Sequence, residues 1–531
     1  MPADVVITGA RIWGRGLGDI GIGGSLFVEP EVGPDTEVID ATGMTVVPGF
    51  QDAHVHTPFA GLNRLRVWLN DAETRDDYLR IIAEKARVCP GSDWITGGGW
   101  SMPQFPGGTP RKEDLDTIVP DRPVFLFNRD LHGAWLNSRA LQAAGITATT
   151  PDPPDGRIER DADTGEPTGT LHEGAAYWVN EHVVPPPSQT QWEEAICHGQ
   201  QHLHSLGITG WQDAWVTPAT QAAYLALAAD GRLTARVVGA LWWDRHRGLD
   251  QIEELVARRE LAAPGFHPTT VKIMIDGVLE NYTGALLEPY CDGCGGHTDN
   301  NGLAFIDPEL LRAAVTALDA AGFQVHMHAI GDRAARMALD AVAAARERSG
   351  MNDLRHHIAH LQLVHPTDLP RFAELGVTAN CQMYWASSDA QMAELTIPYL
   401  GPERARLQYP FASLARAGAR LAMGSDWSVS TADPLTQIEV GATRIDPATP
   451  DEPAFLPEER ITVALGIDAF TAGSAYLNHD ENAARLGVGC RADLALLGAD
   501  ITKGRIATGH GLSQVPLRLT VAGGTIVHSD L

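Results

Sequence analysis

The chain has 531 residues, with 40 Lys and Arg against 67 Asp and Glu, a formal net charge of −27 and a pI near 5.0. This acidic balance disfavours partners such as nucleic acid or an anionic membrane, because both require a basic surface. A hydrophobic content of 44% provides a sizeable core, and the length exceeds the roughly 250 residues of a bare (β/α)₈ barrel. We therefore expect an enlarged or multidomain protein that acts on a small-molecule substrate.

The sequence lacks the patterns of a secreted or membrane-spanning protein. The start, MPADVVITGARIWG, has no basic segment followed by an apolar one, and no apolar run reaches the ~18 residues of a membrane helix. Six cysteines in so long a chain do not make a disulfide framework. The expectation is a cytoplasmic protein with no membrane partner, and a homodimer is an option left open.

One C-x-x-C pair raises the question of a structural zinc site. The segment CDGCGGH contains Cys291, Cys294 and His297. Structural zinc takes four ligands and this segment offers three, so we interpret it as a glycine-rich loop.

Both ends of the chain are rich in predicted strands. Residues 1–50 contain short alternating strands such as VVITGARIWG, and a similar texture returns in residues 480–531, for example in PLRLTVAGG. Strands at opposite ends pair only if the part between them folds back on itself. We predict a small β-sandwich built from both termini and interrupted by a larger domain over residues 51–479.

The interior alternates apolar, β-rich runs with helical patterns, which predicts βα units around a parallel sheet. Eight candidate strands are found, the number of an α/β TIM barrel. The first two are separated by far more than a normal βα connection, so residues of about 60–188 are predicted to form an inserted subdomain near the active-site mouth. The candidate strands cover residues 50–56, 208–214, 235–241, 270–276, 324–330, 355–361, 377–382 and 420–426.

Polar side chains fall at successive strand ends. His54 and His56 are two apart in GFQDAHVH, so on a strand both rings project from the same side and can bind one ion. In TIM barrels catalytic groups come from the carboxyl ends of several strands. The candidate metal ligands in strand order are His54, His56, Lys272, His328, His360 and Asp426.

Two further features complete the predicted metal centre. An unmodified Lys272 would repel divalent cations, whereas a carbamate formed from CO₂ would be anionic and able to bridge two metals. His326 and His356 are interpreted as core residues or as supports of the ligands, and His202 and His204 as surface residues. Imidazole and carboxylate donors favour zinc, although manganese, cobalt or iron would accept the same set.

Aromatic residues gather near the proposed mouth, which predicts a largely apolar pocket. They are Trp100, Phe105, Tyr282, Tyr384, Trp385 and Trp427.

The sequence resembles the amidohydrolase superfamily, and within it the amidohydrolase-3 group that includes YtcJ-like proteins and N-substituted formamide deformylases. The resemblance covers nearly the whole chain and rests on TVVPGFQDAHVH, GAWLNSRALQAAGI, VKIMIDG, HAIGDRA, MGSDW and GVGCRADLALL. It implies a β-sandwich plus (β/α)₈ barrel. It also implies one metal on His54, His56 and Asp426, another on His328 and His360, and a carboxylated Lys272 as bridge, although members vary between one and two metals.

The implied reaction is hydrolysis of a C–N bond in an amide, formamide, carbamate or urea-like substrate. A hydroxide bridging the metals would attack the carbonyl, and Asp426 would carry its proton to the departing nitrogen. Two positions of the group, His132 and Glu173, are expected to contact substrate or support the ligands.

Three departures from the group's pattern lie where substrate is expected. Ala359 precedes His360 in place of the usual Glu, residues 382–385 read QMYW in place of Q-P-x-H, and residues 281–284 read NYTG in place of S-R-T-A. The predicted substrate-binding residues are Tyr282, Gln382 and Trp385 at these departures, together with the aromatic Trp100 and the group positions His132 and Glu173.

Three alternatives remain open at this stage. A lactonase, esterase or phosphotriesterase uses the same metal site, because such a hydroxide also attacks esters. A deaminase usually has a glutamate shortly after the strand-five histidine, where this chain reads HAIGD. A regulatory protein that has lost catalysis would keep the fold but has no need of every ligand.

Overall fold

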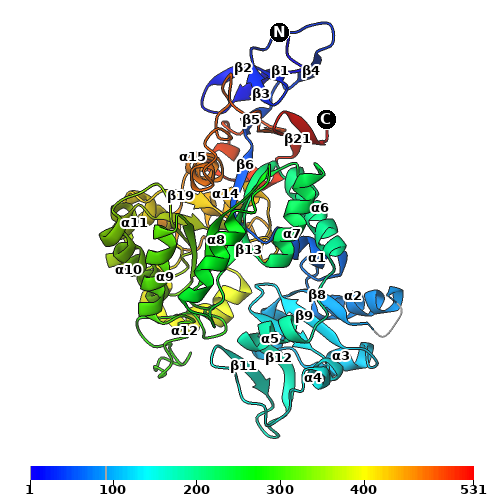
Figure 1. Cartoon of the computed structure of the whole chain (residues 1–531), viewed down its shortest axis with the longest axis vertical. Coiled ribbons are helices and arrows are strands. Elements are labelled where there is room, and N and C mark those ends of the chain that lie inside the picture. Colours follow the sequence, from blue (N-terminus) through cyan, green and yellow to red (C-terminus); the bar gives the residue numbers. More distant parts are fainter. Residues whose placement is uncertain (1, 90–92) are drawn as a thin grey trace.

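The computed structural model describes residues 2–89 and 93–531. Its centre is an eight-stranded sheet of parallel neighbours in the order β19-β18-β17-β16-β15-β14-β13-β6 (Figure 1). This confirms the predicted TIM barrel. The strands are β6 (Phe50–Val55), β13 (Ile208–Val216), β14 (Arg236–Trp242), β15 (Phe266–Met274), β16 (Gln324–Ala329), β17 (His357–His360), β18 (Thr378–Cys381) and β19 (Leu421–Met423).

Helices connect successive strands and cover the outer face of the barrel. Their amphipathic patterns and N-caps follow from sequence; in α9, for example, Asp307 accepts hydrogen bonds from the first turn and Pro308 occupies the first helical position. The main ones are α6 (Gln189–Ser205), α7 (Pro218–Ala229), α8 (Ile252–Arg259), α9 (Pro308–Ala320), α10 (Asp332–Ser349), α11 (Leu369–Leu375), α13 (Phe411–Arg416) and α14 (Pro434–Thr443).

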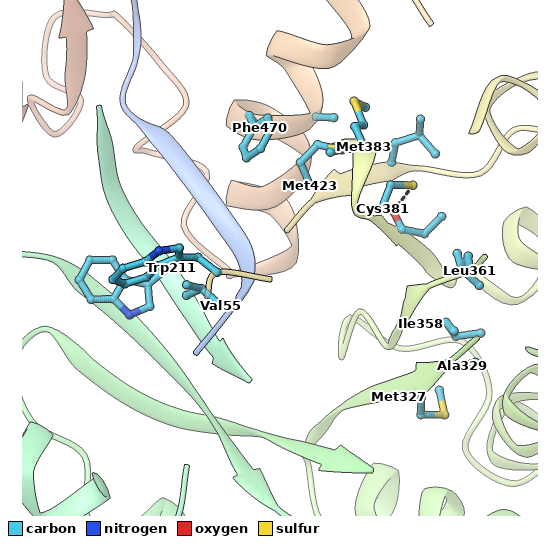
Figure 2. Close-up of a cluster of buried hydrophobic side chains, with 14 of the residues drawn as sticks. Val55, Trp211, Met327, Ala329, Ile358, Leu361, Cys381, Met383, Met423 and Phe470 are labelled. Carbon is cyan, nitrogen blue, oxygen red and sulfur yellow. Dashed lines mark hydrogen bonds between the residues drawn. The ribbon is translucent and has the colours of Figure 1, made fainter. Parts of the chain in front are cut away.

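The two-residue period of a strand separates apolar from polar side chains along the barrel wall. Val55, Met327 and Ile358 are fully buried in one hydrophobic cluster (Figure 2). The same cluster contains Leu339 of α10. Each of these three residues follows or precedes a histidine in sequence. The side chains of His54, His56, His326, His328 and His357 therefore project to the opposite side, into the barrel. His360 departs from this alternation, since it lies two positions after Ile358 but has a φ of +78°, and its side chain lines the interior as well.

The two edge strands of the barrel sheet are joined by hydrogen bonds beyond the end of β19. The backbone N–H of Asp426 donates to the carbonyl of His54 at 2.8 Å, and that of Ser425 donates to Asp52 Oδ1 at 3.0 Å. A Cβ at Gly424 would lie 2.4 Å from the Cβ of His54, so only glycine permits this approach. This contact brings Asp426 beside the histidines of β6.

Strands from both chain ends share one sheet at the amino side of the barrel, where Figure 1 places both termini. The link is β20, which pairs antiparallel with β5. The sheet contains β1 (Val5–Ile12), β2 (Gly16–Gly23), β3 (Leu26–Val28), β4 (Glu37–Asp40), β5 (Thr45–Pro48), β20 (Leu494–Leu497), β21 (Leu517–Ala522) and β22 (Thr525–Ser529).

A third, six-stranded sheet lies between β6 and β13 in sequence, at the carboxyl side of the barrel strands (Figure 1). Its strands are β7 (Val67–Trp68), β8 (Ile95–Trp100), β9 (Val124–Asn128), β10 (Gly133–Leu136), β11 (Gly156–Arg160) and β12 (Pro167–Glu173). The helices of this segment are α1 (Thr57–Leu65), α2 (Arg75–Val88), α3 (Lys112–Ile118), α4 (Ser138–Ala143) and α5 (Gly174–His182).

The observed strands differ from the predicted ones mainly at their ends. The eighth strand ends at Met423, so Asp426 lies in the following loop with a φ of +55°.

None of the helices in residues 2–89 and 93–531 combines the length and the apolar character that a membrane span requires. Cys291 is buried and Cys294 is exposed, and neither forms a disulfide among the described residues.

Candidate metal centre

His54, His56 and Asp426 form a compact group at the carboxyl ends of β6 and β19. The Nε2 atoms of His54 and His56 lie 3.2 and 3.0 Å from Asp426 Oδ1. All three side chains are buried, and their ligand atoms lie within 4.8 Å of one another. Burial raises the pKa of Asp426, but the neighbouring His54 and His56 outweigh it and hold this pKa well below its usual range. Asp426 is therefore a carboxylate.

Several buried acceptor atoms in this group have no hydrogen-bond partner among the described residues. They are His54 Nε2, His56 Nδ1, His360 Nδ1 and Asp426 Oδ1. An unpaired buried polar atom costs about 1–3 kcal/mol, so nearby unpaired acceptors indicate a ligand. Imidazole nitrogen and carboxylate oxygen are the donors that zinc and similar divalent ions accept. The residues present thus fit a divalent cation.

His328 and His360 extend the group across the barrel. Their rings lie 4.5 Å apart between centroids, and the ring of His360 lies 4.7 Å from that of His54. His328 Nδ1 lies 3.1 Å from Asp276 Oδ1, which leaves Nε2 as its free nitrogen. Burial holds the pKa of both rings well below the usual value, so both are neutral and able to act as ligands.

Asp276 is a functional candidate that sequence reasoning did not single out. It lies just beyond β15, in the segment VKIMIDG, and is fully buried. It also accepts backbone hydrogen bonds from Ile330, Gly331 and Ala285. A carboxylate that orients a ligating histidine is a common support of metal sites. The only sequence signal was an acidic residue at the end of the predicted strand 270–276.

Lys272 projects from β15 into the same space and is 2% exposed. The described residues offer its ammonium no hydrogen bond or ion pair within bonding distance. Burial lowers the pKa of Lys272 to about 7, despite the opposing attraction of Asp426. Near neutral pH, Lys272 is therefore an uncharged amine in a large fraction of the molecules.

His132 and Glu173 reach the centre from the inserted segment. His132 Nδ1 lies 2.9 Å from Glu173 Oε2, and Thr283 Oγ1 donates to Glu173 Oε1 at 2.8 Å. Burial lowers the pKa of His132, but the Glu173 carboxylate more than offsets it and raises that pKa to about 9. The His132 ring lies 5.5 Å from that of His328. The pair is thus a buried imidazolium and carboxylate beside the metal ligands.

Backbone strain gathers at these same positions. Glu173, His360 and Asp426 have φ values of +51°, +78° and +55°. Non-glycine residues adopt such angles at a cost of about 1–3 kcal/mol, and they cluster at functional sites.

Two adjoining cavities lead to the centre. The inner one, of about 50 Å³, is lined by the six predicted ligands and by His132, Tyr177, Trp215 and Trp385, among others. The outer one, of about 530 Å³, is lined by Trp385, Tyr384, Trp427 and polar residues that include Arg129 and Glu280. Trp385 lines both cavities. Its ring stacks on that of His360, with 5.2 Å between the centroids and 3° between the ring planes. Trp385 therefore lies at the passage between the two cavities.

Four residues predicted to bind substrate lie outside the described lining of both cavities, and one of them is Glu173, which bonds to His132. Trp100 is in the core of the inserted segment, where its indole donates to the Leu126 carbonyl at 2.9 Å. Tyr282 packs edge-on against Tyr399, and the Gln382 amide donates to Asn380 Oδ1 at 3.2 Å.

The interpretation of His204 as a surface residue is wrong. It is buried on α6, and its ring nitrogens meet the Ile208 carbonyl and Thr234 Oγ1, both at 2.9 Å. Helix α6 packs on the barrel, and His204 lies on its inward face. His202 is half-buried, and its ring lies 4.6 Å from that of Trp427 in the outer cavity.

An α/β barrel with convergent histidines and a carboxylate at its strand ends defines a class of hydrolases. The model described as "Amidohydrolase family" matches residues 37–528, so the chain belongs to the amidohydrolase family. It is accordingly a hydrolase that acts on carbon–nitrogen bonds.

Relatives match over most of their length. Bacillus subtilis YtcJ is 31% identical, over 93% of this chain and 91% of its own. N-substituted formamide deformylase from Arthrobacter pascens is 26% identical, over 90% of this chain and 88% of its own. The crystal structure of an uncharacterised metal-dependent hydrolase from Pyrococcus furiosus is 25% identical with a TM-score of 0.68, and covers 94% of this chain and 99% of its own.

Proposed function

We propose that this amidohydrolase is a metal-dependent enzyme that cleaves the C–N bond of a small, partly apolar amide, formamide, carbamate or urea-like substrate. The observation that carries the proposal is the set of buried acceptors without protein partners, His54 Nε2, His360 Nδ1 and Asp426 Oδ1. The likeness to a formamide deformylase and to a metal-dependent hydrolase supports it.

The proposed metal ligands are His54, His56, Lys272, His328, His360 and Asp426. A divalent ion bound there supplies a Lewis acid that polarises a carbonyl and lowers the pKa of water. Asp426 accepts a proton from the attacking water and delivers it to the departing nitrogen, so that the amide and water yield a carboxylic acid and an amine. Because His54 and His56 hold its pKa below the usual range, Asp426 is ionised and has no proton of its own before the reaction.

Zinc is the proposed ion, as one or two ions per chain, and a carbamate formed on Lys272 would be able to hold two of them. A carbamate forms when an uncharged amine adds to CO₂ and releases a proton. The buried, unpaired amine of Lys272 favours that addition, and the resulting anion would offset the charge of two cations.

Substrate binding is proposed for His132, supported by Glu173, and for Trp385 at the passage between the cavities. The narrow inner cavity suits the reacting carbonyl group, and the aromatic outer cavity suits the rest of the substrate. For Trp100, Tyr282 and Gln382, contact with substrate stays a prediction.

We also propose that residues 1–50 and 480–531 form a β-sandwich domain. The remaining part, 51–479, would be the catalytic barrel, with the segment of about 60–188 covering the site. Its position on the carboxyl side of the barrel strands supports this arrangement. The cytoplasmic location and the homodimer stay predictions.

The test is elemental analysis of protein purified without added metal, followed by assays before and after chelation. We expect at least one divalent ion per chain, loss of hydrolysis on chelation, and recovery with zinc. Full activity after exhaustive chelation contradicts the proposal. A panel of formamides, anilides, carbamates, ureas, lactones and phosphotriesters then separates C–N cleavage from ester cleavage. Ammonia release from an amino-substituted heterocycle identifies a deaminase.

A further inference from the structure

A layer of buried polar side chains lies directly beneath the proposed ligands and makes no contact with the cavities. It consists of Gln212 on β13, Gln324 and His326 on β16, and His357 on β17, all at most 3% exposed. The barrel places the four side chains around its axis, where each must satisfy its hydrogen bonds from within the layer. This requirement determines which atom donates in each hydrogen bond of the layer.

The direction of the network starts from Gln324. Its amide nitrogen lies 2.9 Å from the backbone carbonyls of Arg355 and Leu477, which can only accept. The amide oxygen of Gln324 therefore faces Gln212, whose Nε2 donates to it at 2.9 Å, and Thr270, whose hydroxyl donates to it at 2.8 Å. Gln212 consequently presents its own amide oxygen to the two histidines.

The Gln212 oxygen sets the position of the proton on each imidazole. His326 Nδ1 lies 2.7 Å and His357 Nε2 3.0 Å from Gln212 Oε1. An amide oxygen accepts only, so both nitrogens carry hydrogen. The other nitrogen of a neutral His326 then holds a lone pair, and it lies 2.9 Å from His54 Nδ1.

We infer that Gln212 and His326 are positioning residues that hold His54 as its Nδ1–H tautomer, so that His54 Nε2 presents its lone pair to the metal. His54 Nδ1 donates to His326 Nε2, and His54 Nε2, 3.2 Å from Asp426 Oδ1, is the nitrogen without a hydrogen-bond partner. The assignment follows from donor and acceptor accounting along one chain of contacts. It rests on the proposed function only in naming a metal as the ligand.

A direct test reads the tautomers in the protein without metal. Protein labelled with ¹⁵N in its histidine rings is examined by NMR, and the His54 and His326 signals are identified by their loss in His54→Asn and His326→Gln. We expect one proton on each ring, at Nδ1. A doubly protonated His326, or a His54 protonated at Nε2, overturns the inference, whatever the metal content of the enzyme.

A second test measures zinc affinity by competition with a chromophoric chelator. His326→Leu removes the acceptor for His54 and is expected to weaken zinc binding by about 10–100-fold, the usual effect of losing an outer partner of a ligand. His326→Gln offers an amide donor to Gln212 and an acceptor to His54, and is expected to restore most of the affinity. His357→Leu is the matched control, because it removes a buried imidazole that bonds to Gln212 without reaching His54.

The outcomes separate the two proposals. Equal losses of zinc affinity in His326→Leu and His357→Leu indicate an effect of packing alone. They overturn the inference that His326 positions His54. If wild-type protein does not bind zinc, the proposed function fails, while the NMR result still decides the tautomer. Should His326→Leu not fold, the NMR measurement still decides the tautomers.

Discussion

Two layers of polar side chains inside the barrel differ in how their hydrogen bonds are used. In the upper layer, at the carboxyl ends of the strands, His54, His360 and Asp426 each keep an acceptor without a partner. In the layer below, His326 and His357 use both ring nitrogens. Atoms without protein partners are available to a ligand, whereas fully paired atoms hold their neighbours in place. The difference therefore distinguishes residues that bind from residues that position.

The variant expected to have the largest effect on this comparison is Asp426→Asn. It keeps the shape of the side chain and removes its charge and basicity. We expect the hydrolysis rate to fall by about 10²–10⁴-fold, the usual contribution of an acid–base group. Circular dichroism and thermal unfolding should match the wild type. An unchanged kcat rejects the role of Asp426 as proton carrier.

The next largest effect is expected for Asp276→Asn, which weakens the partner of His328 Nδ1. Metal affinity should fall by about 10–100-fold, since the free nitrogen of His328 is then less well oriented. Asp319→Asn is a matched control, because Asp319 is also buried and bonded to a histidine, His356, at 2.9 Å but lies away from the centre. Equal losses of affinity in both variants would contradict the assignment.

The ion pair of His132 and Glu173 predicts a dependence of stability on pH. The pKa of His132 is raised from 6.5 to about 9 in the folded protein. A raised pKa stabilises the fold below pH 6.5, and this contribution is lost as the pH rises through 9. The measurement is the free energy of unfolding in urea at pH 6.5 and at pH 9.5. Between these pH values we expect it to fall by about 1–3 kcal/mol more for the wild type than for His132→Gln. Parallel curves for the two proteins would exclude a charged His132.

The smallest effect is expected for Trp100→Phe, which tests whether Trp100 binds substrate or only packs. Removal of its bond to the Leu126 carbonyl should cost about 1 kcal/mol of unfolding free energy. KM should stay unchanged, because Trp100 lies outside the described lining of both cavities. A raised KM at unchanged stability would place it in contact with substrate after all.

Much of the barrel and of its ligand set is predictable from local patterns. Alternation in GFQDAHVH places His54 and His56 on one side of a strand, and the order of strands places His328 and His360 at the same rim. These inferences need only the period of a strand and the direction of the chain. The sequence alone therefore determined the eight-stranded parallel architecture and which residue types gather at its mouth.

The tertiary structure decided which atoms are free and which are paired. The contacts that decide this join residues distant in sequence. Asp276 contacts His328, Gln212 contacts His326, and Trp100 faces the core of the inserted segment. No local period specifies them, because they depend on how the strands register and close around the barrel. For the same reason the tautomer of each histidine is set by neighbours from other strands, and only the folded chain reveals it.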